Sequence, residues 1–245
     1  LEDAVAPDLK VEARHLAAQA VHTLVDAGPD GPIVFVRVNA GPTEWFADDV
    51  ASLHPGTQGV ILPKAEDPAQ LAELRWALAA RSLEPLVLGG IESAAGVHRA
   101  VDVAAASDVV YFGAEDYVAD LGGVRTPEGT EVLYARSRVA LAARLASAQA
   151  LDQVVTDYRD DARFDADAAV GRSLGYTGKL CIHPAQVARA SEAFRPSPAE
   201  LERARGIVAT YEAALARGQA ACSYDGQMVD EPVVRQARSI LDSAD

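Results

Sequence analysis

Three features are scarce or absent in this chain of 245 residues: cysteine, long apolar runs and excess positive charge. The two cysteines, Cys181 and Cys222, form no disulfide framework and no zinc-type spacing, which fits a reducing, cytoplasmic setting. No apolar run is long enough to cross a membrane. The net charge of −14 argues against general binding to nucleic acid or to anionic membranes, since both require a basic surface.

What the sequence does contain is a regular alternation of strand-like and helix-like segments. A hydrophobic content of 49% is enough for one sizeable core. The strand-like runs are 32–38, 59–62, 85–88, 108–112, 151–155 and 178–182, and the helix-like stretches between them include 68–81, 94–106, 132–150 and 162–174. This rhythm predicts an α/β fold with a parallel sheet, and we expect a (β/α)₈ TIM barrel with its active site at the carboxyl ends of the strands. A doubly wound sheet is the alternative, although no glycine fingerprint follows a first strand.

The first residues predict an incomplete barrel. Leu1-Glu2-Asp3 is interpreted as the end of a further strand, and a helix follows from about Asp8. The barrel would then lack its first strand, its first helix and part of its second strand. We therefore predict roughly 30–40 more residues upstream in the native protein. The alternative is a genuine N-terminus at Leu1.

The last quarter of the chain departs from this rhythm. We expect residues 1–184 to form the barrel and residues 185–245 to form a C-terminal helical extension. Its helices are predicted at about 185–194, onward to about 217, and at 232–241, with a mixed polar segment at 221–232. A barrel does not need this arm to close, so we expect it to pack on another subunit or to cover the site.

Two carboxylates follow neighbouring predicted strands. Glu92 follows 85–88, and Asp116 lies 24 residues later, after 108–112. Hard cations such as Mg²⁺ take oxygen ligands and keep some of their waters. The pair therefore predicts a metal-assisted enzyme, with a helix cap and a structural ion pair as the alternative reading. Adjacent residues of a strand point to opposite sides, so we expect Asp116 to bind the metal and Glu115 to pair with a cation.

A set of short strings, in order along the whole chain, resembles the citrate lyase beta-subunit-like family, which includes malyl-CoA and citramalyl-CoA lyases. The strings are Leu1-Glu-Asp-Ala-Val5, Phe35-Val-Arg-Val-Asn39, Leu62-Pro-Lys64, Gly90-Ile-Glu-Ser93, Phe112-Gly-Ala-Glu-Asp116 with Leu121-Gly-Gly123, Lys179-Leu-Cys-Ile-His-Pro184, and Tyr224-Asp-Gly-Gln-Met-Val-Asp-Glu-Pro232. In that family a first strand with a phosphate-contacting arginine precedes the Leu-Glu-Asp string. Neither is present in this sequence.

The resemblance implies Mg²⁺-dependent cleavage or formation of a carbon–carbon bond between a 2-oxo acid and an acyl-CoA thioester, with Mn²⁺ as a possible substitute metal. Glu92 and Asp116 would hold the cation as Lewis acid and template. Arg37, a permanent forked donor at a strand end, would bind substrate and stabilise the enolate oxygen. The alternative role for Arg37 is a bridge to a carboxylate such as Asp3.

The resemblance also gives the arm a function. In that family an aspartate of the Gly-Gln-Met-Val-Asp string serves a neighbouring subunit of a trimer, and it corresponds to Asp230. We expect a homotrimer in which Asp230 protonates the acetyl-CoA enolate or activates water. Asp230 also reads as the N-cap of the last helix, with Pro232 just inside it, and the two roles are compatible.

Other polar groups receive supporting roles. We expect Lys64 to form an orienting ion pair with Glu92 or Asp3, and Asp3 to bind metal-bound water. Gly122 and Gly123 are candidates for substrate binding through their N–H groups, or simply form a turn. His183 and Pro184 are candidates for a CoA channel, with a structural hydrogen bond as the alternative for His183.

Three competing functions stay open. A Schiff-base aldolase would use Lys64 or Lys179 to form an imine with a 2-oxo acid. A CoA-free class II aldolase would use the same divalent metal. A citrate lyase beta-type subunit would act on a citryl thioester to give oxaloacetate and would depend on an acyl-carrier protein.

Overall fold

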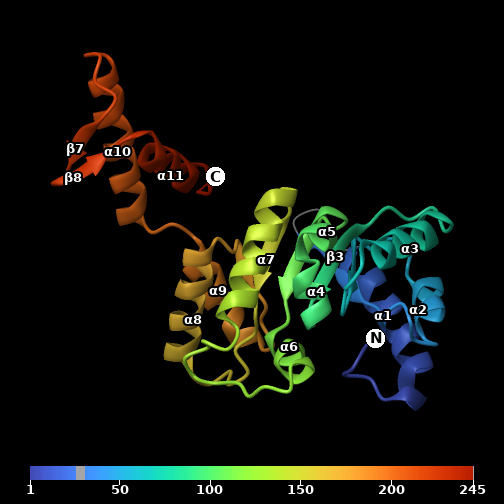
Figure 1. Ribbon diagram of the computed structural model, residues 1–245. Coiled ribbons are helices and arrows are strands. Elements are labelled where there is room, and N and C mark those ends of the chain that lie inside the picture. The colour runs from blue at the N-terminus through green and yellow to red at the C-terminus, as the bar shows by residue number, and fades with distance from the viewer. Residues whose placement is uncertain (26–30, 245) are drawn as a thin grey trace. The chain divides into compact units, whose positions relative to one another are not determined.

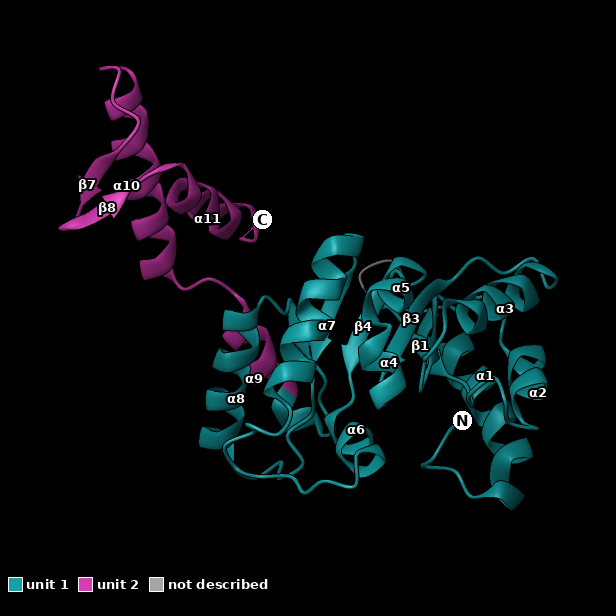
Figure 2. Cartoon of the chain, viewed as in Figure 1, with its two compact units in different colours: residues 1–186 teal, residues 187–245 magenta. Residues whose placement is uncertain are grey.

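The structure is a computed structural model that describes residues 1–25 and 31–244. It divides into two compact units, Leu1–Gln186 and Val187–Asp245 (Figure 2). The sequence placed the boundary between residues 184 and 185. No helix within the described residues combines the length and apolarity needed to span a membrane.

The first unit is built on a parallel sheet of six strands (Figure 1). They are β1 (Phe35–Arg37), β2 (Gly59–Leu62), β3 (Leu86–Ile91), β4 (Val109–Phe112), β5 (Gln149–Asp152) and β6 (Gly178–Lys179). Each strand pairs with the next one along the chain, in the order β1-β2-β3-β4-β5-β6. A doubly wound sheet reverses its strand order at a switch point, so that alternative is wrong. The order is that of a barrel wall, and the predicted α/β fold is confirmed, whereas closure into eight strands stays a prediction.

Helices connect the strands and cover the sheet. They are the 3₁₀ turn η1 (Pro7–Leu9), α1 (Lys10–Val25), α2 (Phe46–Ser52), α3 (Pro68–Ala79), α4 (Ala94–His98), α5 (Ala100–Ala105), α6 (Ala114–Asp120), α7 (Leu133–Ala146), α8 (Asp161–Leu174) and α9 (Pro184–Phe194), which crosses the boundary between the units. Strand residues such as Val60, Val87 and Val110 are fully buried. Burial on both faces explains why the strands read as nearly continuous apolar runs.

Three local predictions are wrong. The helix expected over 132–150 ends at Ala146, because Ser147 adopts a left-handed conformation (φ 56°) that lets Ala148 N–H bond the Ala143 carbonyl at 3.0 Å. The helix expected over 94–106 is interrupted at Arg99. Leu1–Asp3 forms no strand: the Leu1 nitrogen donates to the Arg37 carbonyl at 2.9 Å, but no ladder with β1 follows.

The second unit packs two helices against a β-hairpin. The elements are α10 (Pro198–Leu215), β7 (Cys222–Tyr224), β8 (Gln227–Val229) and α11 (Glu231–Asp242). Its core includes Ile207, Tyr211, Val229 and Val234. The hairpin was not predicted from the sequence. Its two-residue Asp-Gly loop, with positive φ at both positions, is nevertheless a strong local signal for a hairpin turn.

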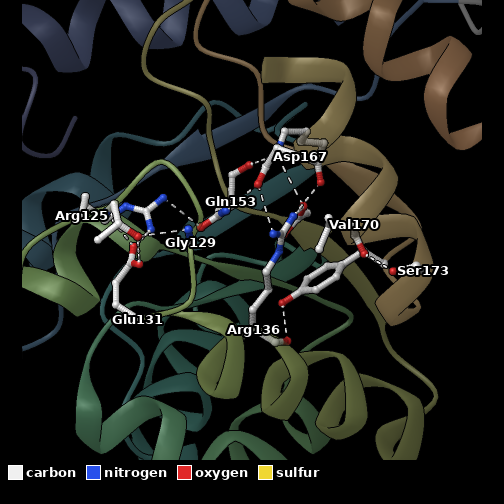
Figure 3. A network of polar contacts seen from close by, with 12 residues as sticks. Arg125, Gly129, Glu131, Arg136, Gln153, Asp167, Val170 and Ser173 are labelled. Carbon is white, nitrogen blue, oxygen red and sulfur yellow. Dashed lines mark hydrogen bonds and ion pairs between the residues drawn. The ribbon is translucent and has the colours of Figure 1, made fainter. Parts of the chain in front are cut away.

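A buried charge network joins β5 and β6 to helices α7 and α8 (Figure 3). Arg136 of α7 binds Asp152 through two hydrogen bonds of 2.8 and 2.5 Å and contacts Asp167 of α8 at 3.1 Å. Lys179 of β6, whose side chain is fully buried, pairs with Asp167 and donates to the Gln153 carbonyl at 2.6 Å. Two cations and two carboxylates balance, which makes burial of this cluster tolerable.

We expect Asp167→Asn to lower the free energy of unfolding by about 3 kcal/mol at pH 7, because Lys179 loses a buried partner. Burial acts to raise the pKa of Asp167, but Lys179 and Arg136 hold it below the ordinary value. The carboxylate therefore stabilises the fold above the unfolded pKa of about 4, and this contribution is lost as pH falls through the folded value. Urea unfolding from pH 7 downward should show the gap between variant and wild type closing.

The matched control is Asp102→Asn, which changes an exposed helix aspartate. Its unfolding free energy should stay within about 0.5 kcal/mol of wild type. An Asp167→Asn protein as stable as wild type at pH 7 would contradict the role given to the network.

Candidate functional site

The Glu92 carboxylate is buried immediately after β3. Its residue is only 4% exposed, although ionised carboxylates are rarely buried without partners. Two glycines make the space: a Cβ on Gly90 would lie 2.4 Å from Glu92 Oε1, and one on Gly113 would lie 2.6 Å from Glu92 Cγ. The absence of side chains at these positions lets the carboxylate lie over the strand ends.

Glu92 has both a hydrogen-bond donor and a second acid beside it. The Tyr111 hydroxyl donates to Glu92 Oε1, and the negative charge of Asp116 acts on the Glu92 carboxyl group. Burial raises the pKa of Glu92 to about 7; the tyrosine hydrogen bond opposes this shift and Asp116 adds to it. Two acids so close share a proton or require a cation.

Asp116 and Glu115 lie in the first turn of α6, not at the end of a strand. The alternation argument that separated them is therefore wrong, but the two side chains do diverge. Asp116 faces Glu92 and lies 3.7 Å from Lys64 Nζ, whereas Glu115 accepts a 2.9 Å hydrogen bond from Arg125. The predicted pairing of Glu115 with a cation agrees with this contact.

Arg125 links Glu115 to the buried charge network of Arg136, Asp152, Asp167 and Lys179. It donates to Gln153 at 3.3 Å, and Gln153 in turn donates to Asp167 at 2.9 Å (Figure 3). A cavity of about 380 Å³ lies beside these residues. Four of its charged lining residues form two ion pairs, Glu115 with Arg125 and Arg136 with Asp167.

The Glu2 carboxylate forms ion pairs with two cations, Arg37 and Lys64. The carboxylate, 6% exposed, lies 3.1 Å from Arg37 Nη2 and 3.2 Å from Lys64 Nζ. Lys64 also pairs with Asp3 at 3.0 Å. Asp3 is one of the two alternative partners predicted for Lys64. The alternative expectation was a bridge from Arg37 to a carboxylate such as Asp3. Such a bridge is present, but its partner is Glu2. Glu2 itself is placed by the buried Lys10, whose Nζ donates to the Leu1 and Glu2 carbonyls.

Lys64 has an unusual backbone conformation with φ 50°. A left-handed non-glycine residue costs roughly 1–3 kcal/mol and is often found at functional sites. Burial opposes its charge, but ion pairs with Asp3 and Glu2 raise the pKa of Lys64 above the ordinary value. The ammonium is therefore permanent, as an orienting ion pair requires.

The charge balance favours a divalent cation. Among the described residues, Glu2, Asp3, Glu92 and Asp116 gather around two permanent cations, Arg37 and Lys64, so that four ionised carboxylates would exceed the cations by two negative charges. No group of three or more potential protein ligands occurs within residues 1–25 and 31–244. Mg²⁺ fits such a donor set, because it is usually bound by one or two carboxylates and completes its shell with water and substrate oxygens.

Several predicted site residues have local structural duties. The Gly122 and Gly123 N–H groups donate to the Ala119 and Val118 carbonyls, which ends α6 as the turn alternative predicts. His183 stacks on Tyr158 with ring centroids 4.5 Å apart, and its Nδ1 accepts from Ala185 N–H.

Pro184 begins α9, and Asp230 belongs to the second unit. Asp230 Oδ1 accepts from Val233 N–H at 3.4 Å and caps α11, as predicted for its structural role.

Comparison with known proteins assigns this chain to a family. Residues 1–184 match the HpcH/HpaI aldolase/citrate lyase family. The chain belongs to this family.

Relatives agree over nearly the whole chain. A citrate lyase subunit beta-like protein of Deinococcus radiodurans is 50% identical over 98% of this chain and 86% of its own length. The human mitochondrial citramalyl-CoA lyase is 32% identical over 98% of this chain and 76% of its own. The crystal structure of CitE from Mycobacterium tuberculosis in complex with magnesium, acetoacetate and coenzyme A has a TM-score of 0.81 at 33% identity, covering 100% of this chain and 88% of that chain.

Two residues of this cluster, Glu2 and Tyr111, were not predicted from the sequence. Asp3 was chosen instead of its neighbour Glu2, because nothing in Leu1-Glu2-Asp3 indicates which of the two acids is buried. Tyr111 was assigned to the apolar strand. The signal available was Gly90, since a glycine in a strand often marks the close approach of another group.

We expect Gly90→Ala to displace the Glu92 carboxylate. The new Cβ would lie 2.4 Å from Glu92 Oε1 and 2.5 Å from the Tyr111 hydroxyl oxygen, and such overpacking costs about 1–3 kcal/mol. Binding of Mn²⁺, a paramagnetic substitute for Mg²⁺, should weaken together with stability. Urea unfolding and electron paramagnetic resonance of free Mn²⁺ measure the two effects.

Gly89→Ala is the matched control. Its Cβ would meet Ser107 Oγ at 2.6 Å, so it costs stability without touching Glu92. Equal losses of Mn²⁺ affinity in both variants would contradict the role of Gly90 in making space for the Glu92 carboxylate.

Proposed function

We propose that this protein is a Mg²⁺-dependent carbon–carbon lyase that cleaves or forms a 3-hydroxyacyl-CoA such as citramalyl-CoA or malyl-CoA, with acetyl-CoA and pyruvate or glyoxylate as the other partners of the reaction. The observation that carries the proposal is the contact between Glu92 and Asp116, with two negative charges in excess beside Arg37. The names of the citramalyl-CoA lyase relative and of the CitE complex with magnesium and coenzyme A support it.

Glu92 and Asp116 would hold the cation, which supplies Lewis acidity and a template for the oxygens of the 2-oxo acid. Glu92 is buried, whereas the Asp116 side chain is 47% exposed. The pair therefore combines one rigid ligand with one that faces the solvent, from which the substrate arrives.

Arg37 would bind the substrate oxygen that gains charge as the carbon–carbon bond breaks. Its guanidinium is anchored by Glu2 at 3.1 Å, yet the side chain stays 42% exposed. Such a group can donate further hydrogen bonds without reorganising, which is how oriented donors stabilise an oxyanion. Because the guanidinium cannot lose its proton at working pH, it acts as a donor and not as a base.

Asp230 would carry a proton. We propose that its carboxyl group protonates the acetyl-CoA enolate, or activates water, in a neighbouring subunit of a homotrimer. Its position as N-cap of α11 places it at the start of a well-defined helix, at a hairpin end. A cap oxygen and a proton carrier are compatible because a carboxylate has two oxygens.

A Schiff-base mechanism is disfavoured by the surroundings of both candidate lysines. Lys64 Nζ contacts carboxylates of Glu2, Asp3 and Asp116 within 3.7 Å. Lys179 Nζ is buried between Asp152, Asp167 and the Gln153 carbonyl. An imine-forming lysine must be neutral, and these ion pairs favour the charged form.

A carrier-dependent citrate lyase beta-type subunit, producing oxaloacetate from a citryl thioester, is the second candidate. The family to which the chain belongs includes citrate lyase, and the Deinococcus radiodurans relative is named as beta-like. Purified protein that cleaves only the carrier-linked citryl thioester, and no free CoA thioester, would favour this candidate.

We expect Glu92→Gln and Asp116→Asn each to lower the rate of citramalyl-CoA or malyl-CoA cleavage by about 10³-fold, because each removes a charged metal ligand worth several kcal/mol. Release of 2-oxo acid with and without Mg²⁺ is the measurement. Glu115→Gln is the matched control, since the neighbouring acid pairs with Arg125 and should leave the rate within a few-fold of wild type. Cleavage that survives complete chelation of divalent metals would refute the mechanism.

We expect Arg37→Lys to lower kcat by about 100-fold with a smaller change in KM, since a lysine keeps the charge but loses the forked geometry. Steady-state kinetics at saturating Mg²⁺ separates the two constants. Arg75→Lys, which changes a half-exposed arginine paired with Asp108, should have little effect. Equal kcat in wild type and Arg37→Lys would show that a point charge suffices.

A further inference from the structure

Tyr111 connects the two sides of the site. It is on β4 directly opposite Gly90 of β3, and only 4% of it is exposed. Its hydroxyl donates to Glu92 Oε1, and the positive charge of Arg37 acts on the same phenol. The predicted metal ligand and the predicted substrate-binding arginine therefore both lie in the electrostatic field around one buried phenol.

A phenol has a single proton, and Tyr111 donates it to Glu92 Oε1.

This arrangement selects one oxygen of Glu92. The Tyr111 hydroxyl and, at 3.4 Å, the Lys64 N–H both donate to Oε1. A carboxylate oxygen held by protein donors is less available to a cation, so Oε2 is left as the better ligand. Partners of this kind orient metal-binding carboxylates, and their removal commonly costs about 10–100-fold in metal affinity.

We propose that Tyr111 is a positioning residue that orients Glu92 for a divalent cation. The inference rests on the function proposed above, since it presupposes that Glu92 binds metal. Removing the hydroxyl would free Glu92 to rotate, whereas Arg37 would keep its ion pair with Glu2.

The test is Mn²⁺ binding to Tyr111→Phe, measured on the purified full chain by electron paramagnetic resonance of the free ion. We expect the dissociation constant for Mn²⁺ to rise by about 10-fold or more. The matched control is Tyr176→Phe. That variant also removes a buried phenol hydrogen bond, to the Arg136 carbonyl at 2.8 Å, but away from Glu92.

Both variants should lose similar stability in urea, and only Tyr111→Phe should lose Mn²⁺ affinity. A double-mutant cycle with Glu92→Gln gives a second measurement, in which the two changes in Mn²⁺ affinity should not be additive, because Tyr111 acts through Glu92. Additive effects, or Mn²⁺ binding by Tyr111→Phe equal to wild type, would overturn the role of Tyr111 while leaving the lyase intact. Wild-type protein that binds no Mn²⁺ and cleaves no thioester would overturn the proposed function as well.

Discussion

The burial of the Glu92 carboxylate is the constraint on which the site depends. A carboxylate at 4% exposure, with the negative charge of a second acid acting on it, is stable only if it is protonated or neutralised. Gly90 and Gly113 provide the space for it, and Tyr111 provides the donor. These features have no evident value for a sheet that needs only apolar packing, so they indicate a strand end shaped around a charge.

Other ion pairs of the first unit fix the positions of the charges around this carboxylate. Glu2 anchors Arg37 and Lys64 on one side, and Arg125 fixes the beginning of α6 on the other. From Arg125 the contacts continue through Gln153 to the balanced cluster of Arg136, Asp167 and their partners. Rigid support of this kind is what a preorganised site requires, because a displaced donor stabilises a transition state poorly.

Local sequence patterns were sufficient for most of the secondary structure. Continuous apolar runs located all six strands of the sheet, since a strand buried on both faces leaves that signature regardless of its neighbours. The errors occurred where local geometry interrupted a pattern: Ser147 ended a helix before β5, and Arg99 divided another. The β7–β8 hairpin was missed because strands of three residues are too short to show alternation.

By itself, the sequence determined the α/β alternation, the placing of Glu92, Asp116 and Arg37 after neighbouring strands or at their ends, and the acidic charge that argues against general binding to nucleic acid or anionic membranes. These properties follow from residue order and composition. Only the tertiary structure decided that Glu2, rather than Asp3, holds Arg37, and that Tyr111 donates to Glu92. Those partners come from strands and segments distant in the chain, and neighbouring parallel strands bring them together through their register, which no local pattern encodes.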